Sequence, residues 1–189
     1  MSTRSSTVKV WPRLIGRFVH DRRGVSAVEF ALLLPVMIAL YLGGVEISSA
    51  VSIQRKVTLT AGTVANLTAQ ATSLVTSDMT NIMNASTSIL APYSTTGATV
   101  TVSCLGIDAS GKAKVDWSVT QGGTARASGS VVTIPAALAV PSTQLIYSEV
   151  SYPYKPIIGY TITGTLTLSD HMYMSPRISA PTYNNIACS

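Results

Sequence analysis

The chain has 189 residues and a net charge of +5, with 47% hydrophobic and only 11% charged side chains. Residues 1–24 hold six of the 13 Lys and Arg residues and one of the eight acids, so the net charge belongs to this stretch and the remaining charges balance. This distribution excludes a nucleic-acid-binding domain, which would carry basic groups on its folded surface, and the low charged fraction is atypical of a soluble domain.

An apolar segment follows the basic leader. Residues 25–53 carry no charge except Glu29 and Glu46. About 20 apolar residues span a bilayer as a helix, so we predict a transmembrane helix over 25–53, with a buried core helix as the alternative. Basic residues flank one side only, and no second apolar run follows. The positive-inside rule therefore predicts a single-pass inner-membrane protein with residues 1–24 in the cytoplasm and the C-terminal part in the periplasm.

Glu29 is the informative residue of this segment. An ionisable group near the start of a membrane helix is costly, and it is usually paired or functional. If the chain is cut after Gly24, Val25 becomes a free amine one helical turn from Glu29. The carboxylate can then neutralise that amine, or the amine of a neighbouring subunit, which lowers the cost of both charges. A glutamate that simply points to water at the interface is the alternative.

The pattern around Gly24 resembles a known family. A glycine, four residues, a glutamate and an aromatic residue form the sequence that type IV prepilin peptidases recognise, here with Glu29 and Phe30. The longer string is similar to TadE/TadG-like proteins of the tight-adherence (Flp, type IVc) pilus system. The matching residues are Ala27-Val28-Glu29-Phe30-Ala31-Leu32, Pro35, Gly43-Gly44-Val45-Glu46 and, more weakly, Tyr152-Pro153-Tyr154-Lys155-Pro156.

The resemblance implies cleavage after Gly24 by a prepilin peptidase, with the mature helix retained in the membrane. It implies a minor pilin or pseudopilin that meets other pilin-like subunits and the pilus assembly platform. The processing positions are Gly24, Val25, Glu29 and Phe30, and the assembly positions are Glu29, Pro35 and Glu46. Alternatives are a membrane-anchored adhesin or binding module, a type II secretion pseudopilin, and a conventional secretory cut after Ser48-Ser49-Ala50.

A helical extension is predicted over 54–91. Apolar residues recur there at helical spacing: Val57, Val64, Leu67, Ala71 and Leu74. Pro35 should bend the preceding helix or weaken its hydrogen bonding locally. A short stalk helix without a filament role is the alternative.

Residues 92–189 are predicted to form a β-rich periplasmic domain, so the fold class is α+β. Apolar residues alternate with polar ones over 100–104, 115–119 and 160–168, as in half-buried antiparallel strands. A further strand is expected over 144–152, which Pro153 and Pro156 should stop or confine to an edge. The tail with Pro176 and Pro181 is expected to be irregular.

Cys104 and Cys188 are the only cysteines. In an exported domain we expect them to form a disulfide that ties the tail to the sheet; two unpaired thiols are the alternative.

No motif predicts catalysis, a cofactor or a metal site. Gly106–Ala113 nearly matches a phosphate-binding loop, but it ends in Ala and precedes a predicted strand, so a turn is expected. His171 stands beside Asp170 without a second histidine at ligand spacing, and is expected to be solvated or hydrogen-bonded. The tyrosines between Tyr147 and Tyr183 are expected to pack in the sheet, with a contact surface as the alternative.

Overall fold

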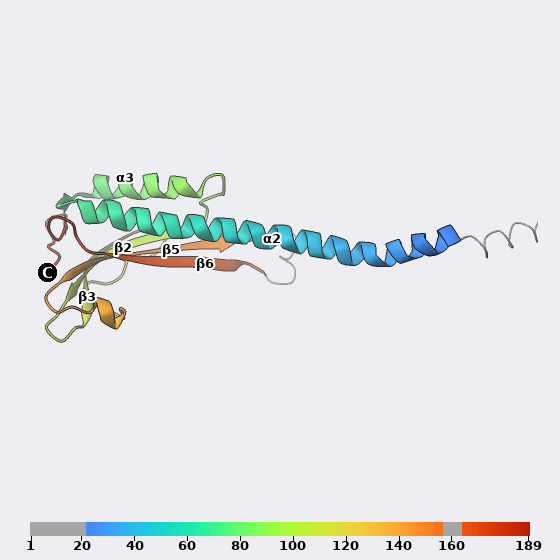
Figure 1. Cartoon of the computed structure of the whole chain (residues 1–189). Coiled ribbons are helices and arrows are strands. Elements are labelled where there is room, and N and C mark those ends of the chain that lie inside the picture. The colour runs from blue at the N-terminus through green and yellow to red at the C-terminus, as the bar shows by residue number, and fades with distance from the viewer. Residues whose placement is uncertain (1–21, 157–163) are drawn as a thin grey trace, which may run out of the picture. The chain divides into compact units, whose positions relative to one another are not determined.

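The computed structural model describes residues 22–156 and 164–189. The chain divides into two compact units, which meet between Val45 and Glu46. The basic leader up to residue 21 lies outside the described residues, and so do Tyr160 and Ile162, which were expected to begin a strand. Figure 1 shows a long helix, α2, and a β-sheet covered by helices on one face.

The helix α2 (Arg22–Gln70) runs through Pro35 without a break. From Ile53 onward it buries one side, in a stripe with spacings of three and four residues, as an amphipathic helix does. The buried positions are Ile53, Val57, Thr60, Ala61, Val64, Ala65, Thr68 and Ala69.

The helical extension ends earlier than its apolar pattern predicts. α2 stops at Gln70, so the prediction of helix is wrong for Ala71 and for Leu74, which lies in the short strand β1 (Ser73–Leu74). A second helix, α3 (Thr76–Thr87), follows, and then the short 3-10 helix η1 (Ser88–Leu90). Asp78 accepts a hydrogen bond from the backbone N–H of Val75 at 3.1 Å, which caps α3 at its N-terminus.

Five antiparallel strands form one sheet in the order β4-β3-β2-β5-β6. The strands expected around residues 100–104, 115–119 and 144–152 are confirmed, and the α+β class is confirmed with them. Their bounds are β2 (Thr99–Ile107), β3 (Ala113–Gln121), β4 (Val131–Val132), β5 (Gln144–Tyr154) and β6 (Leu166–Met174).

Pro153 lies inside β5 rather than beyond its end. The pairing of β5 with β2 ends at Ser151, whereas Pro153 is still paired with Thr167 of β6. Proline cannot donate a ladder hydrogen bond and is tolerated where one neighbour is missing. The expected confinement to an edge therefore holds locally, although β5 is otherwise an inner strand.

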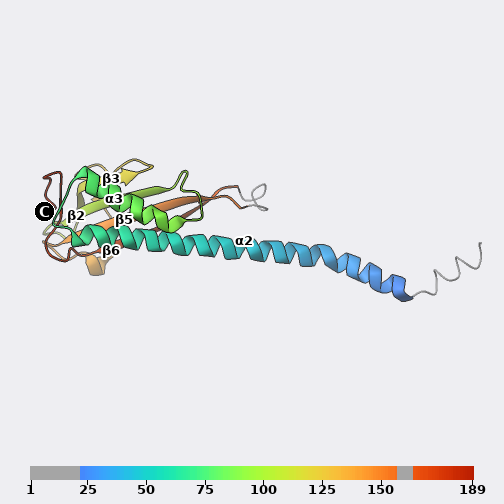
Figure 2. The same cartoon turned by 90° about the horizontal axis from the view of Figure 1, so that it is seen from above.

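The main core lies between the sheet and the helices. α3 and the second part of α2 lie side by side over the same sheet face (Figures 1 and 2). Ser148 of β5 reaches across this layer and donates to the backbone carbonyl of Ala61 at 2.7 Å. The opposite face carries a smaller apolar cluster made of Leu105, Ile107, Ala113, Val115, Val132, Leu145 and Tyr147.

The C-terminal tail is held at several points. Cys188 forms a disulfide with Cys104 of β2, with Cα atoms 5.9 Å apart. The short strand β7 (Thr182–Tyr183) pairs with β1 in parallel, which the expectation of an irregular tail did not include. The indole N–H of Trp117 donates to the carbonyl of Pro181 at 3.1 Å. The tail thereby fastens the end of α2 to the sheet.

Candidate membrane and assembly site

The first part of α2 exposes apolar side chains all around the helix. None of its most apolar 18-residue window is buried within the protein, and the helix is long and apolar enough to cross a membrane. Phe30, Leu32 and Leu40 are 58%, 72% and 73% exposed. A surface of this extent is typical of a segment covered by lipid or by other proteins.

The predicted processing residues lie at the start of this helix. Gly24, Val25, Glu29 and Phe30 are all exposed and all helical, so Val25 and Glu29 are one turn apart on neighbouring positions of the helix surface. A Cβ atom added to Gly24 would meet nothing within 4 Å. Packing against the described residues therefore does not require this glycine, although glycine in a helix costs about 1 kcal/mol relative to alanine.

Pro35 and the glycine pair Gly43-Gly44 weaken the middle of the same segment. Pro35 has no N–H to donate to the carbonyl of Ala31, so the helix lacks one of its hydrogen bonds there. Cβ atoms added at either glycine would meet nothing within 4 Å. Because they lack side chains, the two glycines leave the helix backbone accessible to lipid or to a neighbouring protein.

Glu46, the third predicted assembly residue, opens the second unit and lies beside β5. The hydroxyl of Tyr154 donates to the backbone carbonyl of Glu46 at 3.5 Å. Burial, together with the negative charge of Glu46 and the neighbouring Tyr93, raises the pKa of Tyr154. The structure therefore separates the two glutamates, because Glu46 belongs to the folded domain and Glu29 to the exposed apolar segment.

A cavity of about 670 Å³ lies next to Tyr154, and sequence reasoning did not find it. We call it the tyrosine cavity, after Tyr93, Tyr152 and Tyr154 in its wall. The other lining residues are Ser49, Ile53, Ser94, Thr96, Gly97, Pro153, Lys155 and Thr165. They come from α2, from the loop before β2, from the end of β5 with the following Lys155, and from Thr165 just before β6, so only the fold brings them together. The weak Tyr-Pro-Tyr-Lys resemblance was the one signal in the sequence.

The opposite sheet face carries a charged and aromatic cluster that the sequence also did not reveal. Arg126 forms two hydrogen bonds of 2.7 Å with the carboxylate of Glu149 and lies 5.5 Å from the ring centre of Tyr147. The hydroxyl of Tyr147 donates to Glu149 at 3.0 Å. The rings of Tyr147 and Tyr173 are stacked at 4.7 Å, and His171 meets Tyr173 edge-on at 5.5 Å.

The electrostatics of this cluster favour the ion pair. Partial burial would raise the pKa of Glu149, but the hydrogen bonds from Arg126 and Tyr147 and the charge of Arg126 outweigh it, and the pKa is lowered. Burial, together with the adjacent carboxylate, raises the pKa of Tyr147 well above its ordinary value. His171 thus has aromatic neighbours in Tyr147 and Tyr173, and its charge interacts with that of Glu149.

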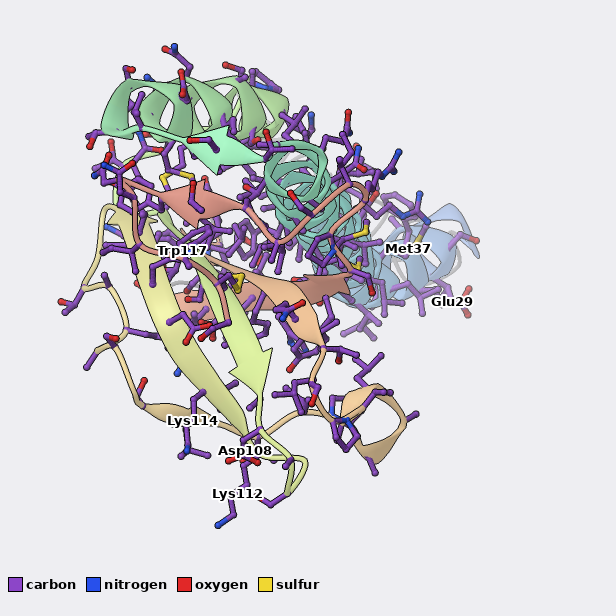
Figure 3. All side chains as sticks on the ribbon, turned by 90° about the vertical axis from the view of Figure 1, so that its left-hand side faces the viewer. Glu29, Met37, Asp108, Lys112, Lys114 and Trp117 are labelled. Carbon is purple, nitrogen blue, oxygen red and sulfur yellow. A yellow bond between two sulfur atoms is a disulfide. The ribbon has the colours of Figure 1, made fainter. Side chains whose placement is uncertain are left out.

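The segment that resembles a phosphate-binding loop is a β-hairpin turn. Asp108 accepts from the backbone N–H groups of Ser110 and Lys112 at 2.9 and 3.0 Å, and Gly111 has φ +78°. Figure 3 shows Asp108 between Lys112 and Lys114 at this turn, and Lys114 forms an ion pair with Asp108 at 3.3 Å. The carboxylate occupies the backbone donors that a phosphate would need. Within the described parts of the chain, no three metal-ligating side chains gather.

Residues 24–66 match the model of a family described as TadE-like protein. This match confirms, for that segment, the resemblance to the TadE/TadG-like proteins of the Tad pilus system, and it includes Gly24, Glu29, Pro35 and Glu46. No curated protein and no solved structure matches the chain. The β-sheet domain lies beyond the matched residues, so its role has to be argued from its own structure.

Proposed function

We propose, from the TadE-like character of residues 24–66, that this chain is a minor pilin or pseudopilin-like subunit that supports assembly of a tight-adherence pilus. A prepilin peptidase cleaves it after Gly24. The TadE-like segment points to a Tad pilus-associated, structural role. The observation that carries the finer proposal is Glu29, an exposed carboxylate one turn from Val25 and the only charged residue of α2 between Val25 and Val45.

The cost of this carboxylate supports the proposal. Among the side chains that the structure describes, from residue 24 onward, none forms an ion pair with Glu29. An isolated charge at the centre of a membrane helix costs about 2.5–3.5 kcal/mol or more, and a charge near the start of the helix costs part of that. A free amine at Val25, in the same chain or in its neighbour, would offset that cost, and only cleavage after Gly24 creates it.

Gly24 supports the same reading. Among the described residues, nothing lies within 4 Å of a Cβ atom added at Gly24, and the glycine lowers the stability of the helix. A protease that binds the chain in an extended form needs a position where the backbone is accessible and easily unwound. Glycine meets that need, so the local weakness of the helix is explained by recognition rather than by folding.

The disulfide is consistent with a periplasmic domain. Cys104 and Cys188 are joined in the structure, and such bonds persist in the oxidising periplasm rather than in the cytosol. Together with the basic leader, the disulfide supports an orientation in which the N-terminus lies in the cytoplasm, the part of α2 up to Val45 crosses the inner membrane, and residues 46–189 lie in the periplasm. The partners are then the prepilin peptidase, other pilin-like subunits and the assembly platform.

The N-terminal residue of the mature protein tests cleavage. The protein is purified from its native membranes, with and without an active prepilin peptidase in the cells, and its intact mass and first residue are measured. We expect Val25 when the peptidase is active and the uncut leader when it is inactive. A start at Met1 or Ser2 in both strains would rule out the processing step, and a start at Val51 would indicate conventional secretion.

Assembly is tested with Glu29→Gln, and Asp78→Asn is the control. Both variants remove one exposed carboxylate, but only Glu29 lies in the exposed apolar segment, because Asp78 lies in the first turn of α3. A pilus subunit loses assembly in Glu29→Gln far more than in Asp78→Asn, as counted by pili per cell. A membrane-tethered binding module is the alternative, and it would keep its activity in both variants because its sheet domain carries the function.

A further inference from the structure

The tyrosine cavity has the size and lining of a ligand site. Its volume of about 670 Å³ lies in the range of about 300–1,000 Å³ that is typical of pockets for small ligands. Its floor is apolar and aromatic, because Ile53, Tyr152 and Tyr154 are each less than 10% exposed. Its rim is polar and open, with exposed Ser94 and Lys155. A ligand with an apolar body and a polar end therefore fits this cavity.

The charge of the lining selects the sign of that polar end. Among the lining residues that the structure describes, Lys155 is the only one with a charged side chain. The other polar side chains of the lining are hydroxyls, on Tyr93, Tyr152 and Tyr154 and on Ser49, Ser94, Thr96 and Thr165, and hydroxyls can donate hydrogen bonds. The cavity thus offers a cation and donors beside an apolar floor, which complements an amphiphile with an anionic head.

The position of the cavity along α2 indicates that such an amphiphile would be a lipid of the surrounding bilayer. The uncharged run of α2 ends at Val45, and Ser49 lines the cavity. At 1.5 Å per residue, Ser49 lies about 6 Å further along the helix axis. The headgroup layer of a bilayer is roughly 5–8 Å thick on each side, so a spanning apolar segment would bring Ser49 to the headgroup level. Tyrosine is enriched at that level, and a lysine there can keep its stem along apolar surface while its ammonium reaches the headgroups.

We propose that the tyrosine cavity is a phospholipid site at the periplasmic surface of the inner membrane. Its walls contact the glycerol and first methylenes of one lipid, and the ammonium of Lys155 pairs with the lipid phosphate. The inference rests on the proposed function in one respect, since it requires the apolar part of α2 to span the bilayer. It adds that the sheet domain is held at the membrane by lipid contact before the subunit moves into an assembly.

Spin labels on introduced cysteines test the depth of the cavity. Cys104 and Cys188 are joined to each other, so each new cysteine is the only free thiol. The full chain is reconstituted in vesicles of equal parts phosphatidylethanolamine and phosphatidylglycerol. It carries one label at Ser94→Cys on the rim, at Val36→Cys in the apolar segment, or at Ala125→Cys on an exposed loop. Relaxation by a water-soluble nickel chelate and by lipid-soluble oxygen then reports the depth of each label.

The labels separate this inference from the proposed function. We expect the label at Val36→Cys to be shielded from nickel, the label at Ala125→Cys to be open to it, and the label at Ser94→Cys to be several-fold less accessible than that at Ala125→Cys. A rim label as accessible as the loop label, with Val36→Cys still shielded, overturns the lipid site and leaves the membrane anchor intact. An accessible label at Val36→Cys overturns both.

Lys155→Gln tests the phosphate contact directly, with Lys112→Gln at the hairpin turn as the matched control. One interfacial charge is worth about 1 kcal/mol. We therefore expect Lys155→Gln to lower the phosphatidylglycerol retained by the purified full chain about fivefold, as counted by native mass spectrometry, while Lys155→Arg and Lys112→Gln retain it. Equal retention in Lys155→Gln and Lys112→Gln would show that Lys155 does not hold the lipid phosphate.

Discussion

One helix, α2, serves two environments, and its two parts differ in what covers them. Before Val45 its apolar side chains are exposed on every side, whereas after Ile53 they are buried along one stripe against α3 and the sheet. In the second part, small and polar residues such as Ala61 and Thr60 belong to the buried stripe, where they allow close packing. The comparison shows that hydrophobicity alone does not locate the core, because the more apolar part of α2 lies outside it.

The largest expected effect comes from placing a charge in each part. Val57 is completely buried, whereas Val36 is 57% exposed. Val57→Asp should destabilise the domain by more than about 4 kcal/mol, because it buries an unpaired carboxylate. Val36→Asp should leave the domain folded but lower membrane insertion, at a cost of about 2.5–3.5 kcal/mol. Near-UV circular dichroism and membrane fractionation measure the two outcomes.

The pair Val36→Asp and Val57→Asp can also disprove the division of α2 into two environments. If Val36→Asp lost the near-UV signal of the domain as completely as Val57→Asp, the apolar part of α2 would be a core element. The division of the helix into two environments would then be wrong. Val36→Leu serves as the control, because it keeps the segment apolar and should change neither readout.

The next effect concerns the disulfide, which acts on the second region alone. Cys104 and Cys188 are 84 residues apart in the sequence, so their bond restricts a long loop of the unfolded chain. Replacing both by serine should lower the free energy of unfolding by about 2–4 kcal/mol, measured by chemical denaturation of the full chain. Membrane fractionation should not change, because the bond lies entirely in the domain.

Reduction of the unsubstituted protein is the control for that double variant. A reductant should shift its unfolding midpoint towards that of the variant and should leave the variant itself unaffected. A variant as stable as the oxidised protein would show that the tail is held by β7 and Trp117 without help from the bond.

The sequence predicts best those features that depend on a regular spacing of residues close together in the chain. The alternation over 100–104 and 115–119 predicted β2 and β3, and the spacing of Gly24 and Glu29 predicted the TadE-like resemblance. The end of α2 could not be predicted in this way. Ala71 and Leu74 continue the helical spacing, but Ser73 pairs with Thr182, more than a hundred residues later, and that contact outweighs the local preference.

The two sites that were missed are assembled from distant segments. Arg126 lies in a loop with turn composition, and nothing near it in the sequence indicates that it forms two hydrogen bonds with Glu149 of β5. The tyrosine cavity likewise combines α2, the loop with Tyr93 and the end of β5. Their chemistry depends on tertiary packing between distant segments, and such packing produces no regular spacing of residues in the sequence.

The Arg126–Glu149 pair gives a smaller, pH-dependent effect in the domain. The pKa of Glu149 is lowered from its ordinary 4.5, so its carboxylate stabilises the fold above that pH, and this stability is lost as the pH falls through the folded-state pKa. Glu149→Gln should lower the free energy of unfolding at neutral pH by about 1 kcal/mol. The difference from the unsubstituted protein should shrink below pH 4.5.

Thermal unfolding of the full chain over a pH series measures that difference. Asp78→Asn, which weakens the cap of α3, is the comparison for the loss of another acid. A gap between Glu149→Gln and the unsubstituted protein that stays constant down to acidic pH would show that the pair does not stabilise the fold through ionisation.

Gly24→Ala should have the smallest effect on stability, although it should strongly reduce cleavage by the prepilin peptidase. A Cβ atom there meets nothing within 4 Å, so Gly24→Ala fits the helix without a clash and should stabilise it by up to about 1 kcal/mol. The domain should unfold at an unchanged temperature, because Gly24 belongs to the other unit. Cleavage by the prepilin peptidase should nevertheless fall sharply, since the methyl group opposes unwinding and backbone access. Normal release of Val25 from this variant would mean that the peptidase does not read this glycine.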